Sequence, residues 1–230
     1  MKGNDLKNAW SNNMTVRERR GLFVVITLYF ILVPAGCTLL YLNGKIDENE
    51  ANILSYAITF AYVLIGYLDY LRREFDTLCD NRRRIIPELL ISYAAMYCFN
   101  IIVNTVIGFA DNPNNNAIME TTGTNIKVLA AMTVIMAPFV EELIFRAGVF
   151  GMLRRKNRVA AYAASVLLFS LYHVISYAIV DPSNWLYILQ YIPVSFLLCR
   201  IYERTRTIWS SILFHMLVNL LAVLVLRSVV

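Results

Sequence analysis

Long apolar runs alternate along this chain with short polar segments that are mostly basic. Each run is about 20 residues long, which is the length that a helix needs to cross roughly 30 Å of hydrocarbon. The strands of a transmembrane barrel would instead alternate apolar and polar positions over about ten residues. The pattern therefore predicts an all-α polytopic bundle of about seven transmembrane helices, at Leu22–Leu42, Ile53–Leu71, Ile85–Phe109, Val128–Gly151, Val159–Ile179, Trp185–Arg200 and Ile208–Leu226.

The segments between these runs are too short to hold a soluble domain. Residues 1–20 are polar and predict a cytoplasmic arm, and residues 21–230 predict a single transmembrane helical domain. The composition supports this division, because 58% of the residues are hydrophobic and the mean hydropathy is +0.55. A soluble domain of this length has a lower apolar content.

The basic residues indicate how the bundle is oriented. Of the 21 Lys and Arg residues, 17 lie before the first predicted helix or after the second, fourth and sixth. These segments share one side of the membrane, and the cytoplasmic side carries the excess of positive charge. We therefore expect a multi-pass protein of the cell membrane with a cytoplasmic N-terminus and an external C-terminus. The formal net charge of +5 is divided among several loops, so nucleic acid is not an expected partner.

Ionisable side chains inside the apolar runs are the main clue to function, because they are expensive to place in hydrocarbon. The fourth run contains Glu141, Glu142 and Arg146. Glu142 and Arg146 are four residues apart, so they share a helix face and can form an ion pair. Glu141 points about 100° away and needs either a partner from another helix or a proton. A purely structural ion pair between helices is the alternative interpretation.

Both histidines of the chain also lie in apolar runs. His173 shares a helix face with Phe169 in the fifth run, and His215 shares one with Asn219 in the seventh. Each could be no more than an interhelical hydrogen bond. At 1.5 Å per residue, however, both histidines, the glutamates and Asn219 lie about 14 to 22 Å from the basic edge. This shared depth predicts that they form one site within the bilayer.

Such a set of side chains suits hydrolysis by water. A buried carboxylate is a good general base, and imidazole and amide groups can hold a developing oxyanion. Two histidines and one carboxylate can also hold a catalytic zinc ion, which makes Glu141, His173 and His215 an alternative metal set. The His-Glu-x-x-His pattern of the zincins is absent, and no Ser–His dyad stands out. The residues favour water-mediated hydrolysis, with or without a metal.

Three motifs follow one another on separate predicted helices: Glu141-Glu142-x-x-x-Arg146, Phe169-x-x-x-His173 and His215-x-x-x-Asn219. In this order they resemble the CPBP family of CAAX proteases and bacteriocin-processing enzymes, also called the Abi family, which includes the type II CAAX prenyl endopeptidases. The segment from Tyr202 to His215 is also similar to the family's approach to its last motif. The resemblance covers about residues 128–226. Ala147 departs from the family pattern, in which glycine often follows the arginine.

The resemblance implies an intramembrane endopeptidase in which Glu141 activates the attacking water. Glu142 and Arg146 would then support and orient this base. The implied substrate is a membrane-associated peptide or protein, such as a prenylated C-terminus, a leader peptide or a pheromone precursor.

The same resemblance implies roles for the residues of the other two motifs. His173, supported by Phe169, would help to position the water or the scissile carbonyl. His215 and Asn219 would complete the site at the oxyanion. Zinc stays open as a cofactor in this comparison too.

Two other functions stay open on the sequence. A non-catalytic member of the family would act as a bacteriocin immunity protein or as a membrane regulator. A small ion or proton transporter would use the buried carboxylates as relay groups. No internal repeat is visible, and many transporters are built from repeats, so the transporter is the weaker alternative.

Overall fold

The computed structural model describes residues 10–107, 112–113, 116 and 126–229, and the regular structure in them is helical throughout. The predicted all-α class is therefore confirmed. In chain order the elements are α2 (Val16–Thr27), the π-helical η1 (Leu28–Leu32), α3 (Val33–Leu42), α4 (Glu48–Gly66), α5 (Leu68–Asp80), α6 (Arg82–Ile107), α8 (Ile126–Ala130), the π-helical η2 (Ala131–Met136), α9 (Ala137–Glu142), the π-helical η3 (Leu143–Phe150), α10 (Gly151–Arg154), α11 (Arg158–Val180), the 3₁₀-helical η4 (Pro182–Tyr187), α12 (Ile188–Thr205) and α13 (Ile208–Val229).

Several of these helices can cross a membrane, so the chain is a multi-pass membrane protein. By length and apolar content, four of the described helices are long enough: Val16–Leu42, Arg82–Val103, Arg158–Val180 and Pro182–Thr205. The bent pair of α4 and α5 could supply a fifth span. The count of seven spans and the cytoplasmic N-terminus stay predictions.

The second apolar run does not continue as one straight helix. α4 ends at Gly66, and α5 begins at Leu68 after a bend of 72°. The structure thus corrects the predicted boundary, because the helix expected to reach Leu71 is broken at Tyr67. Tyr70, Leu71 and Glu74 form one buried face of α5, as expected for an amphipathic helix lying on a core. This helix packs against α13.

The end of the predicted polar arm packs into the bundle. Residues 1–9 lie outside the described residues, and α2 begins at Val16 behind a Thr15 capping box. Trp10 is buried and lies edge-on against the rings of Phe150 and Tyr202. Asn12 is also buried and donates a hydrogen bond to the backbone carbonyl of Ala147 at 3.0 Å. From Trp10 onward the chain is therefore part of the packed structure.

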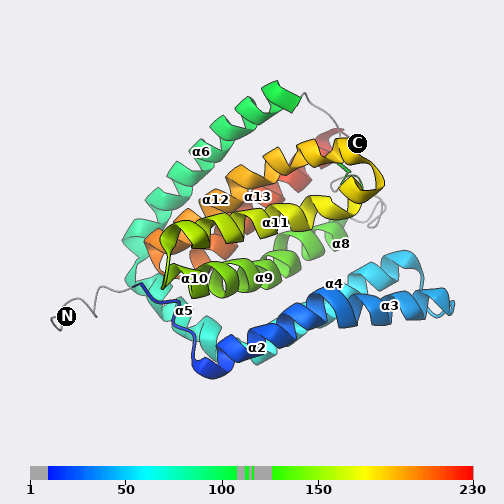
Figure 1. Ribbon diagram of the computed structural model, residues 1–230, viewed down its shortest axis with the longest axis horizontal. Helices are drawn as coiled ribbons and strands as arrows, with labels where there is room; N and C mark the ends of the chain where they lie inside the picture. Colours follow the sequence, from blue (N-terminus) through cyan, green and yellow to red (C-terminus); the bar gives the residue numbers. More distant parts are fainter. Residues whose placement is uncertain (1–9, 108–111, 114–115, 117–125, 230) are drawn as a thin grey trace.

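One interrupted helix, running from α8 to α10, occupies the middle of the molecule. In Figure 1, α2, α3 and α4 lie together on one side of it, and α11, α12 and α6 follow on the other. α13 packs against η2 and α9, and α11 packs against η3. The central helix thus contacts both the N-terminal and the C-terminal part of the chain.

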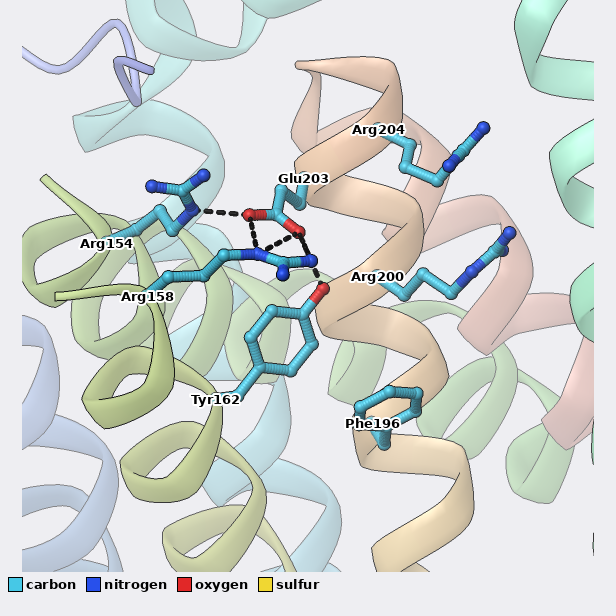
Figure 2. A pocket seen from close by; sticks show the side chains of 7 residues that line it. All are labelled: Arg154, Arg158, Tyr162, Phe196, Arg200, Glu203 and Arg204. Carbon is cyan, nitrogen blue, oxygen red and sulfur yellow. Dashed lines mark hydrogen bonds and ion pairs between the residues drawn. The ribbon is translucent and has the colours of Figure 1, made fainter. Parts of the chain in front are cut away.

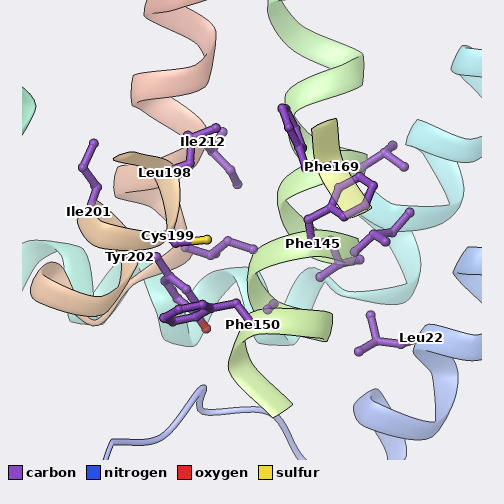
Figure 3. Close-up of a cluster of buried hydrophobic side chains, with 14 of the residues drawn as sticks. Leu22, Phe145, Phe150, Phe169, Leu198, Cys199, Ile201, Tyr202 and Ile212 are labelled. Carbon is purple, nitrogen blue, oxygen red and sulfur yellow. The ribbon is translucent and has the colours of Figure 1, made fainter. Parts of the chain in front are cut away.

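Aromatic side chains fill the core around this central helix. Figure 3 shows Phe145 and Phe150 of η3 beside Phe169 of α11 and Tyr202 of α12. The rings of Phe145 and Phe169 meet edge to face, with centroids 5.3 Å apart. Pairs in this geometry contribute about 0.5–1.5 kcal/mol beyond the area that they bury. The core therefore fixes η3 against α11 close to the buried charges.

Two of the π-helical segments end two residues before a proline. η1 is followed by Val33 and Pro34, and η2 is followed by Ala137 and Pro138. Proline removes a backbone N–H from the helical ladder, and a wider π turn is one way for the backbone to adapt. The same two segments carry or precede residues of the site described next.

Candidate active site

Two adjacent buried glutamates lie where α9 ends and η3 begins. Glu141 has an exposed fraction of 3%, and Glu142 has none. π-helical turns occur frequently at functional sites, because the extra residue moves side chains out of the regular helical register. The sequence predicted the helix but not this change of register.

Glu142 has two nitrogen partners from different helices. Nδ1 of His215 lies 2.9 Å from Oε1, and Nε of Arg146 lies 3.2 Å from Oε2. Arg146 is fully buried and its Nη2 donates to Ser195 Oγ at 3.3 Å. Its guanidinium also lies 4.3 Å from the ring centroid of Phe169, a cation–π contact. The ion pair expected from the spacing of Glu142 and Arg146 is therefore present.

Glu141 finds its partners on other helices. Nε2 of His173 lies 3.7 Å from its Oε2, and Nε2 of His215 lies 3.9 Å from the same oxygen. The hydroxyl of Tyr29 donates to Oε1 at 3.4 Å. Oε2 forms no hydrogen bond among the described residues. The structure thus brings both histidines to Glu141, and they face the oxygen that is free to take a proton.

The second nitrogen of each histidine fixes its tautomer. Nδ1 of His173 lies 2.8 Å from the carbonyl oxygen of Phe169, and Nδ1 of His215 faces Glu142. Carbonyl and carboxylate oxygens only accept hydrogen bonds, so both Nδ1 atoms carry a proton. In the neutral rings the Nε2 lone pairs then face Glu141. Three acceptor atoms facing one another suit a molecule that donates hydrogen bonds, such as water.

Three aromatic residues near this cluster were missed by the sequence reasoning. The hydroxyl of Tyr29 lies 2.5 Å from that of Tyr172, and the ring of Tyr191 stacks on His173 with centroids 4.6 Å apart. Tyr29 is on the first apolar run, which carries no motif. Tyr172 is adjacent to His173 in the chain, but adjacent helical residues face different directions. Only the folded arrangement identifies these contacts.

Asn219 contacts a different part of the central helix. Its Nδ2 donates to the backbone carbonyl of Thr133 at 2.7 Å. η2 continues in π register, with the N–H of Ala137 bonded to Met132, and the next donor in that register would be Pro138. Because proline has no N–H, the amide of Asn219 supplies a hydrogen bond there. Its role at an oxyanion stays a prediction.

The ring of Phe169 contacts both imidazoles and the guanidinium of Arg146. Its ring centroid is 4.4 Å from that of His173 and 5.7 Å from that of His215. The guanidinium of Arg146 also lies over this ring, 4.3 Å from its centroid. Phe169 is 1% exposed, so it holds these groups in place by contact rather than by hydrogen bonding.

The cluster is almost closed to solvent. His173 is its most accessible titratable member, with a side-chain exposed fraction of 13% against 5% or less for His215 and both glutamates. Among the described residues, no group of three or more His, Cys, Asp or Glu side chains could hold a metal ion. No step through a metal is derived for Glu141, His173 and His215, and the zinc alternative stays a prediction.

Comparison with known proteins agrees with the motifs. Residues 123–221 match the family model described as type II CAAX prenyl endopeptidase Rce1-like. The chain carries an Rce1-like domain. The family expected from the three motifs is thus confirmed, and at this level it is a family of membrane proteases. No solved structure is significantly similar to the chain.

Two curated bacterial proteins are also similar to this chain. It is 27% identical over 227 residues to "Putative membrane peptidase YdiL" of Bacillus subtilis (strain 168), an alignment that covers 90% of this chain and 89% of that protein. It is 21% identical over 179 residues to "UPF0177 protein YvdC" of Lactococcus lactis subsp. lactis (strain IL1403), covering 75% of this chain and 65% of that protein. The similarity to YdiL extends beyond the Rce1-like domain.

Proposed function

We propose that this protein is an intramembrane endopeptidase of a bacterial plasma membrane that hydrolyses a membrane-associated peptide with water activated by Glu141. The observation that carries the proposal is the environment of one atom. Oε2 of Glu141 is buried, makes no hydrogen bond among the described residues, and lies within 3.9 Å of both imidazoles. A base in this position removes a proton from water held beside it.

The proposed reaction consumes one water and one peptide bond. Glu141 accepts a proton from the water, whose oxygen then bonds to the scissile carbonyl carbon. The proton passes from Glu141 to the leaving amine as the carbon–nitrogen bond breaks. His173, the more exposed histidine, positions the water or the carbonyl, and Phe169 supports its ring. Asn219 is proposed to face the oxyanion, and His215 is proposed to complete the site there as an imidazolium, because only a protonated Nε2 can donate to an oxyanion.

Glu142 and Arg146 act on this site through His215. The Glu142 carboxylate holds Nδ1 of His215 at 2.9 Å and thereby directs Nε2 toward Glu141. Arg146 in turn fixes Glu142. Partners of this kind orient the groups that contact substrate. We therefore assign positioning roles to Glu142 and Arg146.

The test is cleavage by purified protein reconstituted in liposomes. The probes are a farnesylated peptide ending in a Cys-aliphatic-aliphatic-X sequence and an unprenylated apolar leader peptide, each with a fluorescent reporter. Glu141→Gln should lower kcat by about 10²- to 10⁴-fold, the usual contribution of a general base. Glu48→Gln, which changes an exposed glutamate of α4, is the matched control and should behave as wild type.

The outcomes separate the proposal from its alternatives. Equal rates for Glu141→Gln and wild type would contradict the assignment of the base. If wild-type protein cleaves neither probe, an endopeptidase with this substrate class is wrong, and a non-catalytic immunity or regulatory role becomes the better interpretation. The rate should also survive removal of metal with a strong chelator, checked by elemental analysis. Loss of activity on chelation, with recovery on adding zinc, would contradict metal-free chemistry.

A further inference from the structure

A second polar site lies far from the glutamates on the same central helix. A pocket of about 480 Å³ is bordered by four arginines, one glutamate and two aromatic residues from α10, α11 and α12. Arg154, which borders the pocket, follows Glu141 by 13 residues, a helical rise of about 20 Å. The pocket is therefore at the basic end of the bundle and separate from the candidate active site.

One side of the pocket is held by Glu203 of α12. Figure 2 shows Arg154 and Arg158 directed at its carboxylate, and the hydroxyl of Tyr162 donates to Oε2 at 2.8 Å. Arg158 is bidentate, with its Nε and Nη2 each 2.9 Å from an oxygen. Arg154 bonds to Oε1 through Nε alone. This contact ties α12 to α10 and α11.

The other two arginines share a second carboxylate. Arg200 Nη1 lies 2.7 Å from Oε2 of Glu88, and Arg204 bonds to Oε1 of the same residue. Glu88 is a buried residue of α6. In Figure 2 both arginines extend from α12 on the side opposite Arg154. The four guanidinium groups thus share only two carboxylates.

This arrangement leaves positive charge uncompensated in a concave surface. Four arginines and two glutamates give an excess of two positive charges. Arg154, Arg200 and Arg204 each use one nitrogen on a carboxylate, and Arg158 uses Nε and Nη2. Each of the four guanidinium groups therefore keeps further N–H donors that have no partner among the described residues. Crowded like charges repel each other unless an anion lies between them. Arginine donors match the oxygens of a phosphate group in particular.

One wall of the pocket carries an exposed aromatic ring. Phe196, Arg200 and Glu203 follow one face of α12 at helical spacing, opposite Arg158 and Tyr162 of α11. Phe196 is 43% exposed. Within a multi-pass membrane protein, a basic rim above an exposed aromatic ring has the chemistry of the boundary between headgroups and acyl chains.

We propose that this pocket binds a phosphate group, carried either by an anionic phospholipid or by a soluble phosphate. The phosphate oxygens accept hydrogen bonds from the free guanidinium donors of Arg158 and Arg200, and the exposed wall at Phe196 receives apolar chains when the source is a lipid. The site requires no part of the catalytic cluster. Its occupancy stabilises the contact of α12 with α11.

The test measures binding to the purified full-length protein in detergent. The probes are phosphatidylglycerol, phosphatidylcholine and inorganic phosphate, followed by native mass spectrometry for adducts and by the shift in Tm. Phosphatidylglycerol should bind and raise Tm, whereas phosphatidylcholine should bind at least 10-fold more weakly. Inorganic phosphate that competes with the lipid at this site would indicate a soluble source as well.

Paired variants make the result specific. Arg158→Gln with Arg200→Gln should weaken phosphatidylglycerol binding by about 10-fold or more, because each basic residue near an anionic lipid surface strengthens binding several-fold. Arg72→Gln with Arg83→Gln removes the same charge from exposed positions outside the pocket and should bind as wild type. Glu203→Gln adds net positive charge and should tighten binding even if it lowers Tm.

Three results would overturn the proposal. The first is equal binding of phosphatidylglycerol and phosphatidylcholine with no response to inorganic phosphate. The second is an equal loss of lipid binding in the two double variants. The third is weaker lipid binding by a Glu203→Gln protein that still folds. Each can be observed whether or not the protein cleaves a peptide, so the pocket and the proposed function fail independently.

Discussion

At the scale of single residues, the candidate site depends on how Arg146 is buried. Among the described residues it is the largest fully buried side chain, and it contacts Glu142, Ser195 and Phe169 at once. A buried charge that loses its partner destabilises a protein by about 3–5 kcal/mol. Arg146 is therefore needed for the fold around the site as well as for the orientation of Glu142.

We expect Arg146→Ala to lower the free energy of unfolding by about 3–5 kcal/mol, because Glu142 would keep only His215 as a partner. Thermal unfolding of the purified protein in detergent measures the change. Arg72→Ala removes an arginine whose side chain is 69% exposed, and it should change Tm little. A Tm for Arg146→Ala close to that of the control would show that the buried pair does not stabilise the structure.

The hydrogen bonds of Tyr29 lead to a prediction that the motifs alone do not give. Its hydroxyl connects Oε1 of Glu141 to Tyr172, and a single hydrogen bond contributes about 0.5–1.5 kcal/mol. Tyr29→Phe should therefore lower kcat by about 2- to 10-fold and leave KM nearly unchanged. Tyr41→Phe, at an exposed position of α3, is the control. A change confined to KM would indicate that Tyr29 contacts substrate rather than positioning the base.

The sequence predicted most of the residues that meet at this site, and the reason for its failures is physical. Glu141 and the two histidines could be found because ionisable groups are rare in apolar helices. Tyr29 could not, since tyrosine in an apolar run is common and its partner is 112 positions away in the chain. The hydrogen bond of Asn219 to Thr133 depends on a π register that hydropathy does not encode.

At the scale of elements, α5 has a role that its sequence did not predict. Oε2 of Glu74 accepts a hydrogen bond from the N–H of Ile208 at 2.7 Å, and Thr207 donates to the Glu74 backbone carbonyl. Ile208 is the first residue of α13, the helix that carries His215. A side chain from another helix therefore supplies the N-terminal cap that α13 needs.

Removal of this cap should loosen α13. Glu74→Ala is expected to cost about 0.5–2 kcal/mol, the usual effect of losing a capping side chain. Amide hydrogen exchange in the first turn of α13, together with Tm, measures it. Asp76→Ala changes an exposed carboxylate in the same helix and is the matched control. Unchanged exchange at α13 would mean that Glu74 does not hold this helix terminus.

Helix positions along the chain followed from hydrophobicity, but their interruptions did not. Apolar runs of about 20 residues predict helices because the backbone must be satisfied internally in lipid. The break at Tyr67 follows a Gly66 that lies among equally apolar residues, so hydropathy shows no boundary there. The amphipathic α5 begins inside the run, and its buried Glu74 counts as polar on any hydropathy scale.

At the scale of the whole molecule, the N-terminal helices complete the site of the Rce1-like domain. The family match begins at residue 123, whereas Tyr29 contacts Glu141 from the first helix. α2 and α4 also pack directly against η3 and α9. The part of the chain without motifs therefore forms one wall around the glutamates.

The orientation of the molecule in the membrane gives the last prediction. Cys79 is the last residue but one of α5, after the second apolar run, and Lys45 follows the first run; both are exposed. If α4 crosses the membrane and basic segments are cytoplasmic, these two positions lie on opposite sides.

The starting variant keeps Cys79 and carries Cys37→Ala, Cys98→Ala and Cys199→Ala. A second variant adds Cys79→Ala and Lys45→Cys. In intact cells a membrane-impermeant maleimide should label only the second variant, and after permeabilisation it should label both. The opposite pattern would place the N-terminus outside, and labelling of both in intact cells would mean that α4 does not cross.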